Sequence, residues 1–306
     1  MRPLAWPTVP RLHQDQLDTS VELVRRLLAD QFPEWSDLPV AEVAAHGTDH
    51  HLYRLGDDLV ARLPIIAWAA DQARSDATWL PRLAPYLPTV VPAPLALGAP
   101  GAGYPWPWTV VPWLPGETPT PGNADPVTLA RDLASFTRAL HAVDPTGGPE
   151  KTGTSRGAPL SRLDEGVRRT VAASERLGGL GERVLAVWED AVSAPAWPGP
   201  PTWLHGDLMA GNLLVRDGRL SAVIDWGALG VGDPAPDLCP AWWLFEGEAR
   251  EVWRESAGLD DAAWRRARGW IIAPSVSGID YYAETFPAMA EVGRRTLEAV
   301  VFEAGA

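Results

Sequence analysis

The sequence predicts an α+β protein in two unlike parts, a small, mostly antiparallel β part followed by a larger, mostly helical one. Within residues 40–63, two short apolar runs flank a glycine-containing turn, which is typical of an antiparallel hairpin. Residues 240–300 have the composition and apolar spacing of helices. A chain of 306 residues is also long enough for about two domains.

The composition narrows the range of partners. The chain has 26 basic and 39 acidic residues, a formal charge of −13. This charge disfavours nucleic acids and anionic membranes as partners, and it mildly favours a cationic small molecule. The single cysteine, Cys239, excludes an intramolecular disulfide and is expected to be a small buried residue. No signal-peptide core or membrane-length apolar run is visible, so we expect a cytoplasmic protein.

The first elements can be placed in order. Residues 1–13 are proline-rich and are expected to be irregular. Asp18-Thr19-Ser20 can cap a helix that runs to about Ala29. Its apolar stripe consists of Val21, Val24, Leu27 and Leu28. Two strands follow, His50 to Leu55 and Leu59 to Leu63. The adjacent His50 and His51 would face opposite sides of a strand and are expected at the surface.

The middle of the chain alternates connections with helices. A helix is expected over about 67–83, and residues 84–108 form a proline- and glycine-rich connection before a strand from Trp108 to Trp113. Asp125-Pro126 is a favourable helix start, with aspartate as the N-cap and proline in the first turn. Helices are then expected within 160–195, interrupted at Gly178-Gly179.

A second hairpin brings polar side chains together. Two β-like runs, Leu213 to Arg216 and Arg219 to Asp225, flank Asp217-Gly218, a pair that tolerates positive φ. Opposed residues then have numbers that sum to about 435, which places Asn212 near Val223 and Asp225 near Ala210.

This pairing brings Asp225 beside the loop that carries Asp207 and Asn212. Two carboxylates and an amide suit Mg²⁺ and leave one carboxylate spare. The alternative interpretation is ordinary turn and cap chemistry, in which aspartate and asparagine are common.

Three motifs in this region resemble those of a known family. They are His205-Gly206-Asp207 with Asn212 five residues later, Ile224-Asp225, and Gly232-Asp233-Pro234 followed by Asp237-Leu238. In order and spacing they are similar to the catalytic loop, the metal-binding pair and the following motif of the aminoglycoside phosphotransferase family, within the protein-kinase-like superfamily.

The resemblance implies a two-lobed protein-kinase-like fold, with a nucleotide-binding lobe over residues 1–113 and a catalytic, acceptor-binding lobe over 114–306. ATP and Mg²⁺ would bind between the lobes. Asp207 would take the proton of the acceptor hydroxyl, while Asn212 and Asp225 would hold Mg²⁺. His205 and Asp233 would give structural support, His205 by bonding the backbone near Asp225 and Asp233 by orienting the catalytic loop.

The resemblance also implies a nucleotide site in the first lobe. Arg62 stands where the family has a phosphate-binding lysine, and Asp76 stands where that lysine has its acidic partner. A charge on a strand edge and an exposed aspartate are the alternatives. Backbone groups at Gly47 and Thr48 would cover the phosphates, although the loop has only one glycine.

The strand that ends at Trp113 would lead into the hinge between the lobes. Backbone groups near Trp113 and Leu114 would then meet the adenine edge. An aromatic strand end that packs at a domain boundary fits the same residues.

The identity of the acceptor is the part of the function that the sequence determines least. Residues in the region that closes over the acceptor in this family are Trp242, Trp243, Glu246, Asp280 and Tyr281. The resemblance favours an aminoglycoside, with a macrolide or a small metabolic alcohol as alternatives of the same fold. An alternative from another functional class is a module that binds a nucleotide without catalysis. This alternative arises because Arg62 and the glycine-poor loop differ from the residues that the family has at these positions. The sequence leaves the oligomeric state open.

Overall fold

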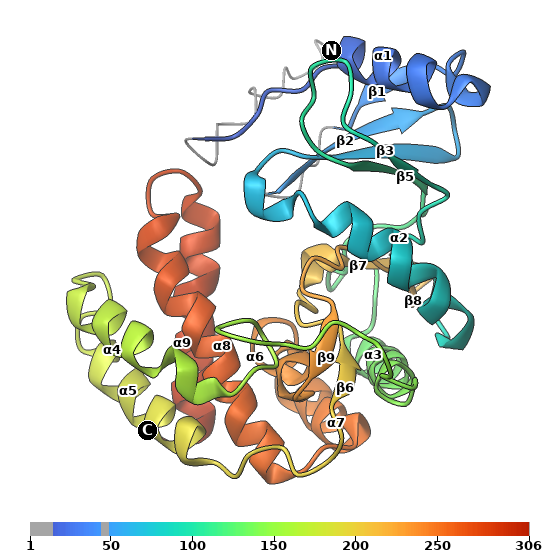
Figure 1. Cartoon of the computed structure of the whole chain (residues 1–306). Coiled ribbons are helices and arrows are strands. Elements are labelled where there is room, and N and C mark those ends of the chain that lie inside the picture. Colours follow the sequence, from blue (N-terminus) through green and yellow to red (C-terminus); the bar gives the residue numbers. More distant parts are fainter. Residues whose placement is uncertain (1–14, 44–48, 306) are drawn as a thin grey trace.

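The computed structural model describes residues 15–43 and 49–305. The proline-rich start of the chain and the residues Gly47 and Thr48 therefore lie outside the described residues. Figure 1 shows two lobes, with α1 and the larger sheet in one and most of the helices in the other. This arrangement agrees with the expected α+β class. No helix within the described ranges is long and apolar enough to span a membrane.

The first lobe is built on an antiparallel sheet. Among the described residues its five strands run in the order β1-β2-β3-β5-β4. Their bounds are Val40–Glu42 (β1), His50–Leu55 (β2), Leu59–Pro64 (β3), Ala96–Gly98 (β4) and Trp108–Pro112 (β5). The predicted β2–β3 hairpin is confirmed, with Leu55 opposite Leu59. Strand β4 lies in the predicted connection, because three residues are too few to show alternation.

Helix α1 (Val21–Gln31) covers the sheet (Figure 1). The hydroxyl of Ser20 accepts a hydrogen bond from the backbone N–H of Leu23, so the predicted cap is present. The residues that the helix buries are Leu23, Val24, Leu27 and Leu28. They pack with the sheet residues Tyr53, Leu55, Leu63 and Trp108. The expectation of a surface position is wrong for His50, which is buried near Arg62, and burial lowers its pKa.

Helix α2 (Gln72–Leu83) lies between the sheet and the second lobe (Figure 1). A short 3-10 turn, η2 (Ala67–Ala69), precedes it. Leu80 and Leu83 belong to the hydrophobic core of the second lobe, whereas Asp76, on the same helix, contacts β3 through Arg62. The helix therefore connects the first lobe to the second lobe through both apolar and ionic contacts.

The second lobe is mainly helical. Its described helices are α3 (Pro126–His141), α4 (Asp164–Ala173), α5 (Leu180–Ser193), α6 (Pro240–Trp243), α7 (Gly247–Ala257), α8 (Asp261–Tyr281) and α9 (Pro287–Ala304). Helix α3 begins as predicted, because the Asp125 carboxylate accepts a hydrogen bond from the backbone N–H of Thr128. Helices α8 and α9 pack against each other as a long antiparallel pair (Figure 1).

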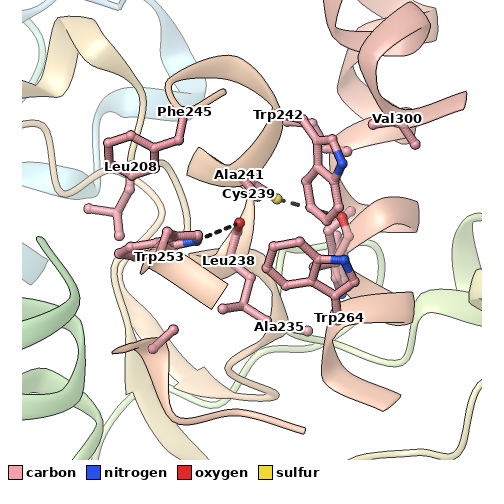
Figure 2. Packing of buried hydrophobic residues seen from close by; sticks show 14 of the residues in the cluster. Leu208, Ala235, Leu238, Cys239, Ala241, Trp242, Phe245, Trp253, Trp264 and Val300 are labelled. Atoms are coloured by element: carbon pink, nitrogen blue, oxygen red, sulfur yellow. Dashed lines mark hydrogen bonds between the residues drawn. The ribbon is translucent and has the colours of Figure 1, made fainter. Parts of the chain in front are cut away.

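Tryptophan side chains fill much of this core. Figure 2 shows Trp253 donating from Nε1 to the carbonyl of Leu238, at 3.2 Å. Trp242 packs against Trp264 with ring centroids 4.9 Å apart, and only 5 % of Trp242 is exposed. The burial expected for Cys239 is confirmed in the same cluster. The expectation that Trp242 contacts the acceptor is wrong, because the ring is enclosed by the packing of α6 against α8 and α9.

The second lobe also contains two small antiparallel sheets of two strands each. Strand β6 (Thr202–Leu204) pairs with β9 (Gly230–Gly232), and β7 (Leu213–Arg216) pairs with β8 (Arg219–Val223). The β7–β8 hairpin is tied to the connection between the lobes, since Glu117 and Val215 exchange two backbone hydrogen bonds. The short turn η5 (Ala210–Asn212) leads into β7, and η6 (Ala235–Leu238) follows β9.

Candidate active site

The β7–β8 turn has the backbone that the sequence predicts. Asp217 and Gly218 have φ values of +52° and +75°. The register differs by one residue from the expected one near the site, because Leu213 pairs with Val223 and a bulge interrupts the ladder. As a result Asn212 lies opposite Ile224, whose N–H donates to the Asn212 carbonyl at 2.9 Å, and not opposite Val223. Asn212 is therefore hydrogen-bonded to the residue that directly precedes Asp225.

Asp207 and Asp225 line one cleft of about 440 Å³. Asp225 has φ +58°, a left-handed conformation that aspartate tolerates better than most residues. This turn follows directly after β8 and directs the chain out of the ladder at the cleft. The side-chain amide of Asn212 donates to the Asp207 carbonyl at 2.8 Å and to its Oδ2 at 3.3 Å. Because its NH₂ group faces Asp207, the amide oxygen is the atom of this side chain that is left as a candidate metal ligand.

The candidate catalytic loop, which carries Asp207, is held by the carboxylate of Asp237. Asp237 is fully buried and accepts hydrogen bonds from the backbone N–H of His205 (3.1 Å) and of Gly206 (2.6 Å). The ring of His141 contacts the same carboxylate at 3.0 Å. The expectation that Asp233 orients this loop is wrong, because Asp233 is instead engaged in a bidentate pair with Arg266 at 2.6 and 3.1 Å.

His205 is buried beneath the loop. Its Nε2 lies 3.1 Å from the carbonyl of Ile224, next to Asp225, which is the kind of backbone contact expected of it. Burial lowers the pKa of His205, so the ring is neutral at pH 7. A neutral, enclosed imidazole links the two halves of the site mechanically and is not placed to exchange protons with a substrate.

Arg62 and Asp76 form the expected pair, with Nη1 and Oδ2 2.6 Å apart. Arg62 also contacts Asp225 through Nη2 at 2.9 Å, a bond that crosses between the lobes. Burial raises the pKa of Asp76 to about 6, although Arg62 opposes the shift. Gln72 completes the cluster, since with its amide turned over its oxygen accepts from Arg62 Nη2 and from the N–H of Gly227, both at 2.8 Å.

Arg156 is a site residue that sequence reasoning missed. It lies in the loop between α3 and α4. Its Nη1 donates to the carbonyl of Gly206 at 2.7 Å and forms an ion pair with Asp207 Oδ1. Burial alone would lower the pKa of Arg156, but the Asp207 carboxylate outweighs it and the pKa is raised. No local pattern marks this arginine, because its partners lie some fifty residues away.

The hinge residues are only partly as expected. The backbone N–H of Trp113 donates to the carbonyl of Asp58 at 2.7 Å, so this N–H is occupied within the protein. The guanidinium of Arg54 lies 3.9 Å from the centre of the Trp113 ring. Trp113 thus closes the end of the sheet, and Leu114, which follows at the connection between the lobes, remains the candidate for the nucleotide base.

The expected acceptor residues lie around the site without lining the cleft. Trp243 donates from Nε1 to the carbonyl of Leu208 at 3.1 Å, next to the catalytic loop. Glu246 is exposed just before α7. Asp280 pairs with Arg176 at 3.4 Å, and Tyr281 is 55 % exposed at the end of α8.

One wall of the cleft is instead formed by the first lobe, by the residue just before β2 and by the segment from η2 into the first turn of α2. Its described residues from this lobe include Asp49, Trp68, Asp71 and Ser75. Trp68 is 61 % exposed and donates from Nε1 to Asp49 at 3.1 Å. One exposed tryptophan among the many buried ones of the described residues gives no sequence signal, so this wall could not be predicted.

Comparison with solved structures supports the two-lobed fold. The GDP and kanamycin complex of APH(2")-IIia matches with a TM-score of 0.73 at 19 % identity, covering 92 % of this chain and 98 % of the other. The streptomycin–ATP–APH(2")-IIa ternary complex matches with a TM-score of 0.57 at 14 % identity, covering 92 % and 99 %.

Macrolide 2'-phosphotransferase MphH from Brachybacterium faecium, as the apoenzyme, matches with a TM-score of 0.61 at 26 % identity, covering 90 % and 97 %. A comparison with curated proteins gives no match. The predicted protein-kinase-like fold is therefore confirmed.

A family model gives the assignment. The model of the phosphotransferase enzyme family matches residues 40–270, more than half of the chain, from the first described strand into α8. That range includes the cleft, the catalytic loop and both small sheets. The chain therefore belongs to the phosphotransferase enzyme family.

Proposed function

We propose that this protein transfers the γ-phosphate of ATP to a hydroxyl group of an amino-bearing small molecule, with an aminoglycoside as the first candidate. The observation that supports this most strongly is that Asp207 and Asp225 line one cleft while the buried Asn212 contacts Asp207 Oδ2 at 3.3 Å. A base beside two oxygen ligands is the arrangement that phosphoryl transfer requires. We place the enzyme in the cytoplasm, where ATP is available.

In the proposed reaction Asp207 receives the proton of the acceptor hydroxyl. Its Oδ1 pairs with Arg156 and its Oδ2 faces the Asn212 amide at 3.3 Å, so the carboxylate is fixed in one orientation. Asp237 fixes the backbone of the same loop through two N–H groups. Catalysis of this kind depends on positioning and electrostatic stabilisation more than on covalent chemistry.

The donor set beside Asp207 fits Mg²⁺. Within the described ranges no group of three or more acidic, histidine or cysteine side chains is arranged to hold a metal. Mg²⁺ in kinases needs only one or two protein ligands, because substrate phosphates and waters supply the others. The amide oxygen of Asn212 and the carboxylate of Asp225 would hold it. When bound, Mg²⁺ neutralises charge that develops on the transferred group.

Arg62 would contact the phosphates of the nucleotide from the first lobe. It is held by Asp76 on one side and lies within 2.9 Å of the proposed metal ligand Asp225 on the other. Its planar guanidinium presents N–H donors in a fixed fork that matches phosphate oxygens, whereas a lysine would present a compact point charge. Leu114 would contact the adenine.

The charge of the cleft supports a cationic acceptor. Its described lining includes the carboxylates of Asp49, Asp71, Asp207 and Asp225 against the guanidinium of Arg156. Trp68 presents its exposed ring next to Asp49. An aromatic face beside a carboxylate is a favourable site for an ammonium group, which gains from both.

A macrolide is the second candidate acceptor. It is favoured by the 26 % identity to a macrolide 2'-phosphotransferase and by the exposed aromatic ring of Trp68, which suits a larger apolar body. Both classes of antibiotic carry amino sugars, so the same pair of Trp68 and Asp49 would serve either.

The test is ADP release with a panel of aminoglycosides, macrolides and small metabolic alcohols, for the wild type and for Asp207→Asn. We expect turnover with an amino-sugar acceptor, and its loss in Asp207→Asn with ATP binding and circular dichroism unchanged. Full activity of Asp207→Asn would refute the role of Asp207. Tight ATP binding by the wild type without turnover on any acceptor would favour a non-catalytic nucleotide-binding module.

A further inference from the structure

Arg156 lies on a loop that is fastened to the catalytic platform. The loop runs alongside β9, because Lys151 N–H donates to the Val231 carbonyl at 2.9 Å and Asp233 N–H donates to the Gly157 carbonyl at 2.9 Å. Strand β9 pairs with β6, which leads directly into the catalytic loop. The backbone around Arg156 is therefore attached to the same sheet that positions Asp207.

The neighbouring glycine allows this close approach. Gly157 has φ +94°, and a Cβ atom there would lie 2.9 Å from the side chain of Leu204. A residue with a side chain would be strained in this conformation and would push the loop away from β6. The segment is thus built to bring Arg156 to the cleft.

The guanidinium keeps donors for a ligand. Nη1 serves both the Gly206 carbonyl and Asp207, and within the described residues no hydrogen bond uses Nε or Nη2. An arginine carries five N–H donors in a fixed plane that matches the oxygens of a phosphate. Arg156 borders the cleft together with Asp207 and Asp225, so its remaining donors are next to the space between base and metal ligand.

The alternative is that Arg156 only neutralises the Asp207 carboxylate. An ion pair of that kind needs no platform of its own and no opening to the cleft, whereas Arg156 has both. The transferred phosphoryl group must also lie between Asp207 and Asp225, because the acceptor hydroxyl meets one and the metal-bound phosphate meets the other. That is the space which Arg156 borders.

We propose that Arg156 is a catalytic residue that binds the transferred γ-phosphoryl group while its Nη1 holds Asp207. This inference rests on the proposed function. In the step, the acceptor oxygen forms a bond to the γ-phosphorus, the bond from that phosphorus to the β-phosphate oxygen of ATP breaks, and ADP leaves with the electron pair. The hydroxyl proton passes to Asp207, and Arg156 stabilises the charge on the equatorial oxygens.

The first test needs no acceptor. Calorimetry with Mg²⁺ compares the affinity of wild type and Arg156→Ala for ADP and for a non-hydrolysable ATP analogue. We expect Arg156→Ala to bind ADP normally and to lose roughly tenfold in affinity for the triphosphate, because one charge-assisted contact is removed. Arg162→Ala, an exposed arginine on the next turn, is the matched control and should change neither value.

The second test uses turnover. With an acceptor found in the panel, kcat of Arg156→Ala should fall about 10²-fold with KM for the acceptor little changed, as for the loss of one donor to a developing oxyanion. Added guanidinium ion at low concentration should restore part of kcat in Arg156→Ala, and Arg156→Lys should retain more activity than Arg156→Ala.

The results separate the two proposals. A wild type that phosphorylates no acceptor would overturn the proposed function, whereas the triphosphate comparison would still report on Arg156. An unchanged preference for triphosphate over diphosphate in Arg156→Ala, in a folded protein, would overturn the inference. If Arg156→Ala does not fold, the comparison is made with Arg156→Lys, whose compact ammonium replaces the five donors of the planar guanidinium by three at one point. A preference for triphosphate over diphosphate equal to that of the wild type would then be the contrary result.

Discussion

Asp237 provides the sharpest test of how the catalytic loop is held. We consider Asp237→Asn, which keeps the volume of the side chain and removes its charge. In the wild type two oxygens accept from two backbone N–H groups, those of His205 and Gly206, and one of them also contacts His141. An asparagine retains one acceptor oxygen and turns an NH₂ group towards a donor.

The expected cost follows from these contacts. One buried N–H loses its partner, which costs about 1–3 kcal/mol, and the remaining bond to a charged acceptor becomes a weaker neutral one. We therefore expect the free energy of unfolding to fall by about 3 kcal/mol. Because the two N–H groups belong to the residues just before Asp207, kcat should fall as well, by up to about 10²-fold for a displacement of 1 Å.

Urea unfolding followed by tryptophan fluorescence measures the first effect, and ADP release measures the second. Asp144→Asn is the control, since Asp144 is exposed and only caps the turn at Thr146, at 3.0 Å. It should change stability by less than about 1 kcal/mol. The reasoning is refuted if Asp237→Asn unfolds at the same urea concentration as Asp144→Asn and turns over at the wild-type rate.

Two further predictions concern stability alone. Burial lowers the pKa of Lys151, the only lysine in the sequence, to about 8 from 10.5, so the unfolded chain binds more protons than the folded one between these values and stability rises with pH there. Between pH 7 and 9.5 the wild type should gain about 2 kcal/mol relative to Lys151→Met in urea unfolding, and parallel pH curves would contradict this. Gly98→Ala should destabilise the first lobe by about 1–3 kcal/mol, because a Cβ atom there would lie 2.2 Å from the Trp108 ring. Gly166→Ala on α4, with no atom within 4 Å of the added Cβ, should be neutral or stabilising by calorimetry, and an equal loss in both variants would show that the contact with Trp108 is not the cause.

Local patterns were sufficient for much of the fold and for the centre of the candidate site. The caps of α1 and α3, the β2–β3 hairpin and the Asp217-Gly218 turn depend on residues within a few positions of one another. The hairpin turn then fixes which residues meet, even though a bulge moved the register by one. Asp207, Asn212 and Asp225 could be placed together on this basis.

Residues with distant partners could not be found in this way. Trp242 was expected at the acceptor and lies in the core, and Asp233 was expected to orient the loop that Asp237 holds. In both cases two similar residues are close in sequence, and only the packing decides which of them points where. Helical spacing alone does not say which neighbour covers a given side of a short helix.

The sequence by itself thus determined the class of fold, the β7–β8 hairpin and the three polar residues at its end, because turns and short-range pairing follow from local chemistry. Only the tertiary structure decided that Arg156 meets Asp207 and that Arg62 crosses the cleft to Asp225. These contacts join residues 51 and 163 positions apart. They depend on how separate lobes and loops pack, and no periodic pattern in the sequence indicates this packing.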